Sequence, residues 1–251
     1  MPTTTKRTPS TKRAAPRQTA DLQTAIRALH QLSDPVRART QRGFFRNCVD
    51  DTFLGVPTAS SRKLAKEFAQ LPLAAIRRLM QSSVHDERSL AHQILCLQFA
   101  RSGEADQKRI FDFYLRNRRF IRDWDGVDDS APYIVGPWLL ARDKSILYDL
   151  ARSPRLWDRR IAIVSTWWFI RNGHLDDTLA LAELLLCDTE DLIHKAIGWM
   201  LRETGKKNLG ALERFLARHH ASMPRTTLRY AIERFPPERR IDYLRGRAII
   251  A

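Results

Sequence analysis

The sequence lacks the residue patterns that build disulfide frameworks and zinc sites. Its three cysteines, Cys48, Cys96 and Cys187, lie far apart in a chain of 251 residues and form no Cys-x-x-Cys pair. The seven histidines form neither a His-Glu-x-x-His nor a His-x-His motif. We therefore predict free thiols in a reducing cytosol, no bound metal and no cofactor.

Long hydrophobic runs and strand-like alternation are also missing. No stretch of 18 apolar residues is present, so the sequence predicts no membrane-spanning helix. From Asp21 onward, apolar residues recur at spacings of three and four, and runs that alternate apolar and polar residues are absent. This pattern predicts an all-α fold of about a dozen helices of ordinary length, joined by short loops.

Acidic residues are absent from the first twenty positions, which contain five basic residues and no hydrophobic segment of the kind that a signal peptide requires. A segment of this composition buries too little apolar surface to fold by itself. We predict a disordered basic tail at residues 1–20 and a single folded domain at residues 21–251. The expected location is the cytoplasm, and the expected state is a monomer.

Positive charge dominates the rest of the composition. The chain carries 43 basic and 28 acidic side chains, which gives a net charge of +15. A charge of this sign favours a polyanionic partner. Nucleic acid is the first candidate, with association with the nucleoid as its consequence, and an anionic membrane surface is the second. Net charge does not determine fold, so a basic protein without a polyanionic partner also remains open.

Local signals mark several helix ends. Asp34 followed by Pro35 is typical of a helix cap and a first helical position. The helix that begins after Pro224 must end before Pro236. Three glycines follow helical segments and are predicted to adopt the left-handed conformation that ends a helix. These are Gly103, Gly173 and Gly205.

A weak repeat runs through the C-terminal half. The tetrapeptides RIAI, HKAI and RYAI begin at Arg160, His194 and Arg229, with spacings of 34 and 35 residues. Each lies early in the second helix of an expected two-helix unit, and this period suits an α-solenoid of HEAT-like helical pairs. The residues that mark TPR repeats are not evident. Coincidence is the alternative, because Ala-Ile is a common pair.

The second helices of a solenoid line its concave face, so equivalent positions form a stripe along that face. Here the stripe would carry Arg160, His194 and Arg229, with Arg159 and Lys195 beside it. A basic concave face suits a curved polyanion, and duplex DNA is the expected partner.

The stretch RDWDGVDDSAP places four aspartates in seven consecutive residues of this basic chain. Asp123 and Asp125 fit the start of a helix, where carboxylates interact well with free N–H groups and with the helix dipole. Asp129 is expected in solvent or beside an arginine. Trp124 and Asp128 are four residues apart, which places them on one helix face. An indole beside a carboxylate attracts a cation.

All six tryptophans lie between Trp124 and Trp199. Trp199 follows Lys195 by four residues and precedes Arg202 by three, on the face that carries the basic stripe. Trp124 and Trp199 are therefore candidate binding residues. Packing in the core is an equally open alternative for each of them.

Three short segments occur in an order that indicates a family. They are WDGVDDSAP, LWDRRIA and HKAIGWMLRETGK, which begin at Trp124, Leu156 and His194. Together they resemble the DNA alkylation repair family, the AlkD-like DNA glycosylases built of HEAT-like repeats. FLGVPTASSRKLAKEF resembles the N-terminal region of this family and PRTTLRYAIERFP resembles its C-terminal region. The resemblance thus covers most of the chain beyond the first twenty residues.

The resemblance implies a role for each matching residue. Asp128 matches the catalytic aspartate of the family, and Trp124 and Trp199 match the two aromatic residues beside it. Arg160 matches an arginine that contacts the DNA backbone next to the lesion. Arg202 follows Trp199 and is implied as a further phosphate contact.

Two positions near the expected helix start depart from the family pattern. Asp123 stands where the family has asparagine, and Gly126 stands where a bulkier residue is expected. Glycine is flexible within a helix. Gly126 is therefore expected to loosen the segment that aims Trp124 and Asp128, and to lower catalytic efficiency.

The implied reaction is hydrolysis of the N-glycosidic bond of purines alkylated at N3 or N7 in duplex DNA. Such a base carries a formal positive charge and leaves as a neutral molecule, so the enzyme needs mainly a carboxylate to stabilise the sugar cation. Asp128 is expected in this role, and no residue is evidently placed as a general acid for a neutral base. The alternative from another class is a non-catalytic HEAT-like protein that binds branched or distorted DNA, and a protein scaffold is a third.

Overall fold

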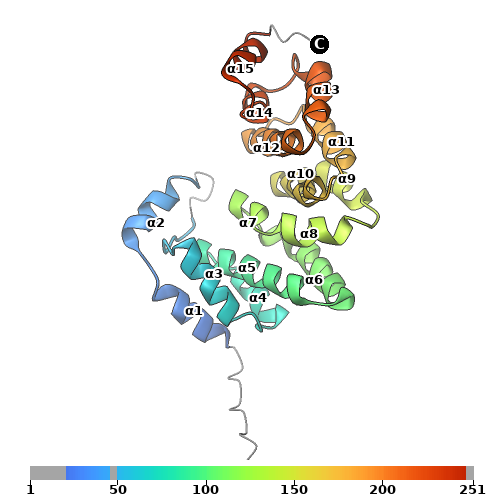
Figure 1. Ribbon diagram of the computed structural model, residues 1–251. Helices are drawn as coiled ribbons and strands as arrows, with labels where there is room; N and C mark the ends of the chain where they lie inside the picture. The colour runs from blue at the N-terminus through green and yellow to red at the C-terminus, as the bar shows by residue number, and fades with distance from the viewer. Residues whose placement is uncertain (1–20, 46–49, 247–251) are drawn as a thin grey trace, which may run out of the picture.

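The computed structural model describes residues 21–45 and 50–246 (Figure 1). The expected basic tail, residues 1–20, lies outside the described residues, as do residues 46–49 and 247–251. Cys96 and Cys187 are free, and Cys48 lies outside the described residues.

The described residues form fifteen α-helices, one 3₁₀ helix and no strand, which confirms the all-α class. The N-terminal helices are α1 (Leu22–His30), α2 (Pro35–Arg42), α3 (Thr58–Glu67), α4 (Leu73–Met80), α5 (His85–Arg101) and α6 (Glu104–Asn117). The central ones are η1 (Arg118–Phe120), α7 (Trp124–Asp128), α8 (Ala131–Leu139), α9 (Ser145–Ala151) and α10 (Leu156–Arg171). The C-terminal ones are α11 (Asp176–Leu184), α12 (Asp191–Lys207), α13 (Leu209–His219), α14 (Arg225–Ala231) and α15 (Pro237–Leu244).

Asp34 caps α2 as the sequence predicts. Its carboxylate accepts hydrogen bonds from the backbone N–H groups of Val36 at 2.9 Å and Arg37 at 3.1 Å. Pro35 occupies the first helical position, where no hydrogen-bond donor is needed. Helix α14 likewise ends before the next proline, as predicted.

Of the three glycines predicted to end helices, only Gly173 adopts the left-handed conformation, with φ +83° directly after α10. Gly103 has φ −74° and is the N-cap residue of α6, because only two residues separate the end of α5 from the start of α6. Gly205 lies inside α12, where a β-carbon would lie 2.5 Å from Cδ2 of Leu212. The prediction is therefore wrong for Gly103 and Gly205, and Gly205 serves the close packing of α12 on α13.

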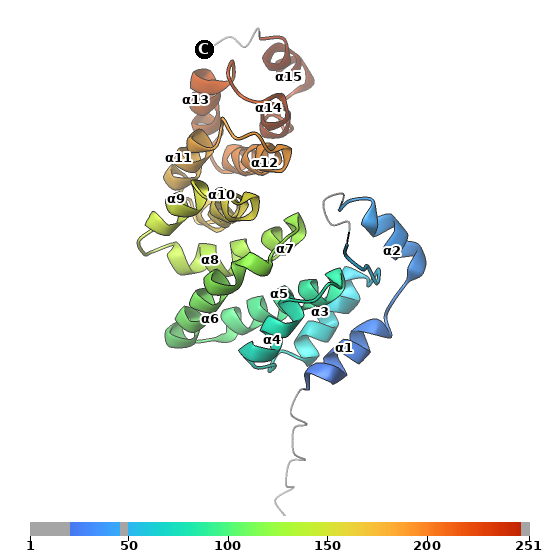
Figure 2. The same ribbon diagram turned by 180° about the vertical axis from the view of Figure 1, so that it is seen from behind.

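Helices α9 to α14 stack in two layers (Figures 1 and 2). Helices α10, α12 and α14 pack on one another in chain order, and α9, α11 and α13 lie along their other side. The tetrapeptides RIAI and HKAI lie early in α10 and α12, as predicted, whereas RYAI lies at the end of α14, with Ile232 as its C-cap, because α14 has only seven residues. On α12, a β-carbon at Gly198 would lie 2.4 Å from Cβ of Tyr230 on α14, so the approach of these helices requires glycine.

The array of helices is curved, and α7 lies between α2 and α10 in both views (Figures 1 and 2). Helix α7 packs on both α5 and α10 and so joins the N-terminal helices to the C-terminal stack. One cluster of buried apolar side chains extends from Ala25 in α1 to Tyr243 in α15. No helix of the described part of the chain has both the length and the apolar character needed to cross a membrane.

Candidate nucleic-acid site around helix α7

Helix α7 begins where the aspartates predict a helix start. Asp123 has an extended backbone, and its carboxylate accepts a hydrogen bond from the N–H of Gly126 at 3.0 Å, so Asp123 is the N-cap. Positions four apart share a helix face. Trp124 and Asp128 therefore lie on one face of α7, as predicted, and Asp125 lies on a neighbouring face.

Asp123 also neutralises a buried arginine of α5. A terminal nitrogen of Arg88 donates to the Asp123 carboxylate at 2.8 Å, and Asp51 accepts from the same guanidinium. Burial would raise the pKa of Asp123, but the charges of Arg88 and His85 outweigh it and hold this pKa below its ordinary value. An asparagine, as in the family pattern, would leave Arg88 with one negative charge fewer beside it. Asp123 is therefore a structural carboxylate in this chain.

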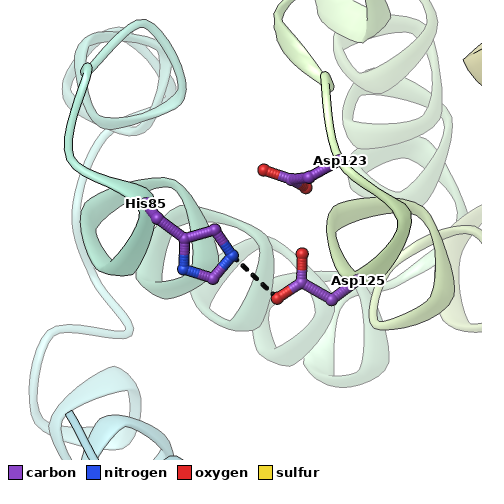
Figure 3. A group of neighbouring side chains, drawn as sticks. All are labelled: His85, Asp123 and Asp125. Carbon is purple, nitrogen blue, oxygen red and sulfur yellow. Dashed lines mark ion pairs between the residues drawn. The ribbon is translucent and has the colours of Figure 1, made fainter. Parts of the chain in front are cut away.

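Asp125 pairs with His85 on α5 (Figure 3). Nε2 of His85 lies 2.9 Å from the Asp125 carboxylate, and Nδ1 lies 3.2 Å from the side-chain amide of Gln41 on α2. Burial raises the pKa of Asp125 to about 7, helped by the charge of Asp123 and opposed by the hydrogen bond from His85. Burial lowers the pKa of His85, but Asp125 outweighs it and the pKa is raised. The sequence gives no signal for this pair.

Asp128, the residue implied as catalytic, forms a two-pronged ion pair with Arg160 of α10. Nε and one terminal nitrogen of Arg160 donate to the two carboxylate oxygens at 2.9 and 2.8 Å. The other terminal nitrogen donates to the carbonyl of Leu192 on α12. The side chains of Arg160 and Asp128 are 6% and 17% exposed. Burial raises the pKa of Asp128 above its ordinary value, although Arg160 opposes this.

This pairing differs from the predicted basic stripe. The stripe would place Arg160 on an open concave surface, whereas its guanidinium is buried and each of its nitrogens has a protein acceptor. The reason is the packing of α7 on α10, which brings a carboxylate to the arginine. Arg160 thus holds α7, α10 and α12 together and fixes the position of Asp128.

Trp124 lies against two consecutive phenylalanines from the N-terminal part of the chain. Its ring stacks on Phe45 with centroids 5.1 Å apart and planes 5° apart, and its Nε1–H donates to the carbonyl of Phe44 at 3.4 Å. The Phe45 ring also lies 4.5 Å from the ring of His85, which links Trp124 to the Asp125 pair. Phe44 and Phe45 belong to no motif, so sequence reasoning missed them.

Two other predicted DNA-binding residues have acidic neighbours. Arg159 on α10 is 15% exposed and donates to Asp188 at 2.6 Å. Lys195 on α12 is 41% exposed and lies 2.8 Å from Asp191, one turn earlier. A surface pair at this spacing is worth only a few tenths of a kcal/mol. Lys195 can therefore exchange its partner for a phosphate more readily than Arg159 can.

The remaining predicted residues lie on α12 and α14. Arg202 is paired with Glu203 and Glu233. Arg229 is exposed and has no ion pair with another residue of the described ranges. Trp199 is half-buried and packs against the core cluster. The structure therefore brings Asp128 and Arg160 into direct contact and places Trp124 one turn before Asp128 on α7.

His85, Asp123 and Asp125 are a group of described residues that could hold a metal ion, since their ligand atoms lie within 4.8 Å of one another (Figure 3). Their hydrogen bonds favour a different use. Asp123 accepts from Gly126 and from Arg88, and Asp125 is bonded to His85. A buried guanidinium beside the group repels a second cation. The absence of a bound metal therefore stays a prediction.

Gly126 has a role opposite to the loosening predicted for it. A β-carbon here would lie 2.5 Å from Oδ1 of Asp123 and 3.0 Å from Cε1 of His92. His92 is fully buried, and burial lowers its pKa to about 4, which keeps the ring neutral. Glycine thus lets the cap of α7 close tightly over His92, so this departure from the family pattern fits the local packing.

Residues 25–235 match the protein family described as "DNA alkylation repair enzyme". The chain belongs to the DNA alkylation repair enzyme family. Membership of this family supports a role in alkylation repair, with DNA as the substrate. A comparison with curated proteins found no match.

One solved structure provides a comparison of folds for this DNA alkylation repair family member. It is described as a predicted DNA alkylation repair enzyme from Enterococcus faecalis, and it is similar with a TM-score of 0.66. The two chains are 18% identical, and the match covers 82% of this chain and 97% of that one. At this level of identity the similarity shows a shared fold.

Proposed function

We propose that this member of the DNA alkylation repair family is a monofunctional DNA glycosylase. Its proposed substrates are purines alkylated at N3 or N7 in duplex DNA. The observation that carries the proposal is the arrangement on α7, where Asp128 lies one turn after Trp124 in a strongly basic chain. The proposed enzyme is a monomer that needs no metal and no cofactor.

The reaction breaks the bond between the sugar and the base. The cationic base leaves with the bonding electron pair and becomes neutral, and the positive charge passes to the sugar. The carboxylate of Asp128 stabilises this sugar cation until water adds to the anomeric carbon and loses a proton. Removing one preorganised group that stabilises transition-state charge typically costs about 100- to 1000-fold in rate.

Because Asp128 is paired with Arg160, a DNA phosphate that binds Arg160 would change the charge that surrounds the Asp128 carboxylate. A guanidinium fork binds phosphate as well as carboxylate, with two parallel hydrogen bonds. A DNA phosphate that draws the fork of Arg160 away would leave the charge of Asp128 free to face the sugar. Arg160 thus acts as a switch between two anions in the proposed mechanism.

The other predicted residues support the proposal as contacts along the duplex. Lys195, Arg202 and Arg229 lie on α12 and α14, and Arg159 lies next to Arg160 on α10. Trp199 on α12 is proposed as a second aromatic wall for the lesion.

A non-catalytic protein that binds branched or distorted DNA is the second candidate. The buried ion pair of Asp128 with Arg160 favours it, because a carboxylate that is already neutralised needs no substrate to explain its presence. The same basic residues would serve such a protein. The two candidates differ in whether Asp128 is needed for anything besides the fold.

The test is base release from four matched duplexes at one salt concentration. The duplexes contain 7-methylguanine, 3-methyladenine, uracil or hypoxanthine at the same position. Release of the two cationic bases and retention of the two neutral ones is the expected result, because only the cationic bases leave without a proton donor. The fixed salt concentration matters because DNA affinity falls steeply with salt.

Two results would count against the proposal in different ways. Efficient release of uracil or hypoxanthine would contradict selection by charge and would direct attention to Asp125, whose pKa of about 7 makes it a proton donor. No release from any duplex, together with tight binding to four-way junction DNA, would favour the non-catalytic candidate.

A further inference from the structure

Helix α2 is bound to the fold along one narrow side and buries none of its own residues. On that side, a β-carbon at Gly55 would lie 2.4 Å from the backbone nitrogen of Ala38, and Gln41 contacts His85 at 3.2 Å. An isolated helix shorter than about 12 residues is marginal in water. Helix α2 has eight residues, so these contacts hold it in place.

The exposed surface of α2 is strongly basic. Three of its eight residues are arginines, and the segment from Pro35 to Phe45 contains no acidic residue. Arg37, Arg39 and Arg42 are all exposed. A helix with this charge attracts a polyanion, and Gln41 ties it to His85, the partner of Asp125 on α7.

Two large apolar side chains are exposed, one on α2 and one in the turn directly after it. Val36 and Phe44 are 66% and 68% exposed, the highest values among the large hydrophobic residues that the structure describes. The carbonyl of Phe44 accepts the Nε1–H of Trp124, so the backbone of Phe44 is tied to the candidate site while its ring points into solvent. An exposed aromatic ring in a basic segment beside a DNA site is a typical wedge between base pairs.

We propose that α2 and Phe44 form a second DNA-contacting element of this protein. The exposed Arg37 and Arg39 of α2 bind phosphates of the duplex next to the site around α7. Phe44 inserts between base pairs from the minor groove and unstacks them next to the lesion. The inference rests on the proposed function, because it takes duplex DNA as the ligand of the site around α7.

Charge and shape favour duplex DNA over the other partners of a basic helix. A helix that lies on a membrane needs an apolar face along its length, and Val36 is the one large apolar residue of α2. A protein partner needs an apolar core of several residues at the interface, and α2 with Phe44 offers two. A DNA backbone, by contrast, is bound by exposed arginine side chains, and α2 has these.

The first test compares two double variants of the full chain in binding to an undamaged duplex. Arg37→Gln/Arg39→Gln removes two charges from α2. Arg77→Gln/Arg78→Gln removes two charges from exposed positions of α4, a helix that lies apart from α2 in both views (Figures 1 and 2). The α2 variant should lose about tenfold in affinity, and the slope of log K against log salt should fall by about 2. The α4 variant should keep the wild-type slope.

The second test measures unstacking with 2-aminopurine in the duplex, whose fluorescence rises when neighbouring bases separate. Wild-type protein should raise the signal, and Phe44→Ala should leave it at the level of the free duplex. Leu209→Ala, which removes a 48% exposed apolar side chain from α13, is the matched control and should behave as the wild type. Neither helix α2 nor Phe44 is buried, so melting temperatures should not change.

Three outcomes would overturn the proposal. One is an α2 variant whose affinity and salt slope equal those of the α4 variant. Another is an unchanged 2-aminopurine signal with Phe44→Ala. The third is loss of binding to anionic vesicles by the α2 variant with DNA binding intact, which would make α2 a membrane contact. Base release is not scored in these tests, so failure of the proposed glycosylase activity is recognised separately.

Discussion

Replacing Asp128 by asparagine keeps the size of the side chain and removes the negative charge that faces Arg160. The structure makes two consequences of this change separable. One is a loss of stability, because Arg160 stays buried with a neutral partner. The other is a loss of transition-state stabilisation, if the carboxylate faces the sugar cation during base release.

The two effects differ in size. Removing one partner of a fully buried ion pair costs about 3–5 kcal/mol. Asp128 is 17% exposed and asparagine can still accept one hydrogen bond from Arg160, so about 1–3 kcal/mol is expected here. Base release should fall by about 100- to 1000-fold, which corresponds to about 3–4 kcal/mol of activation free energy.

The assay is single-turnover release of 7-methylguanine from a duplex, with enzyme in excess so that weaker DNA binding does not limit the rate. Melting temperatures are measured on the same samples. Arg160→Gln is the matched control, because it breaks the same ion pair and leaves the charge of Asp128 in place. The double variant Asp128→Asn/Arg160→Gln tests whether a neutral pair restores the fold.

The catalytic interpretation expects stability to recover in the double variant while base release stays at the level of Asp128→Asn. It also expects Arg160→Gln to release base faster than Asp128→Asn at saturating enzyme. Recovery of activity together with stability in the double variant would refute the reasoning, and Asp128 would then be a structural partner of Arg160. So would wild-type release by Asp128→Asn.

Two further predictions concern the support of α7. Gly126→Ala should lower the free energy of unfolding by about 1–3 kcal/mol, because the new β-carbon would lie 2.5 Å from Oδ1 of Asp123. Gly210→Ala is the control and should be neutral or stabilising, because its β-carbon meets no atom closer than 3.4 Å. Equal melting temperatures for the two variants would contradict this role of Gly126. Because the pKa of Asp125 is raised, the folded protein binds the carboxyl proton of Asp125 more tightly than the unfolded chain does. The stability that this protonation provides is present below the ordinary pKa of 3.8 and is lost as the pH rises to about 7. The melting temperature of the wild type should therefore fall relative to that of Asp125→Asn across this range, and parallel curves would show that Asp125 has an ordinary pKa.

The sequence by itself determined the features that depend on neighbours within one helix. The three- and four-residue spacing of apolar residues predicted an all-α fold, and Asp34 and Asp123 marked two helix starts correctly. The spacing of Trp124 and Asp128 placed them on one face of a short helix. Each of these features follows from hydrogen bonds and side-chain contacts within a few residues, which a local pattern encodes.

The tertiary structure decided which partner each aspartate has. Asp123 meets Arg88 and Asp128 meets Arg160, at sequence separations of 35 and 32 residues. Asp125 meets His85, and no spacing rule connects α7 with α5 or α10. These three aspartates look alike in sequence and differ in function because α5 supplies the partners of Asp123 and Asp125, whereas α10 supplies that of Asp128.

The glycines show the same division. Gly173 and Gly205 both follow helical stretches, yet only Gly173 ends a helix, because Gly205 is held inside α12 by its packing on Leu212. Exposure of α2 is likewise a tertiary property, since nothing in PVRARTQR indicates that no other helix covers it. Local sequence selects the conformation of a segment. Burial, charge pairing and exposure depend instead on which segments meet across the fold, because those contacts join residues that are distant in the chain.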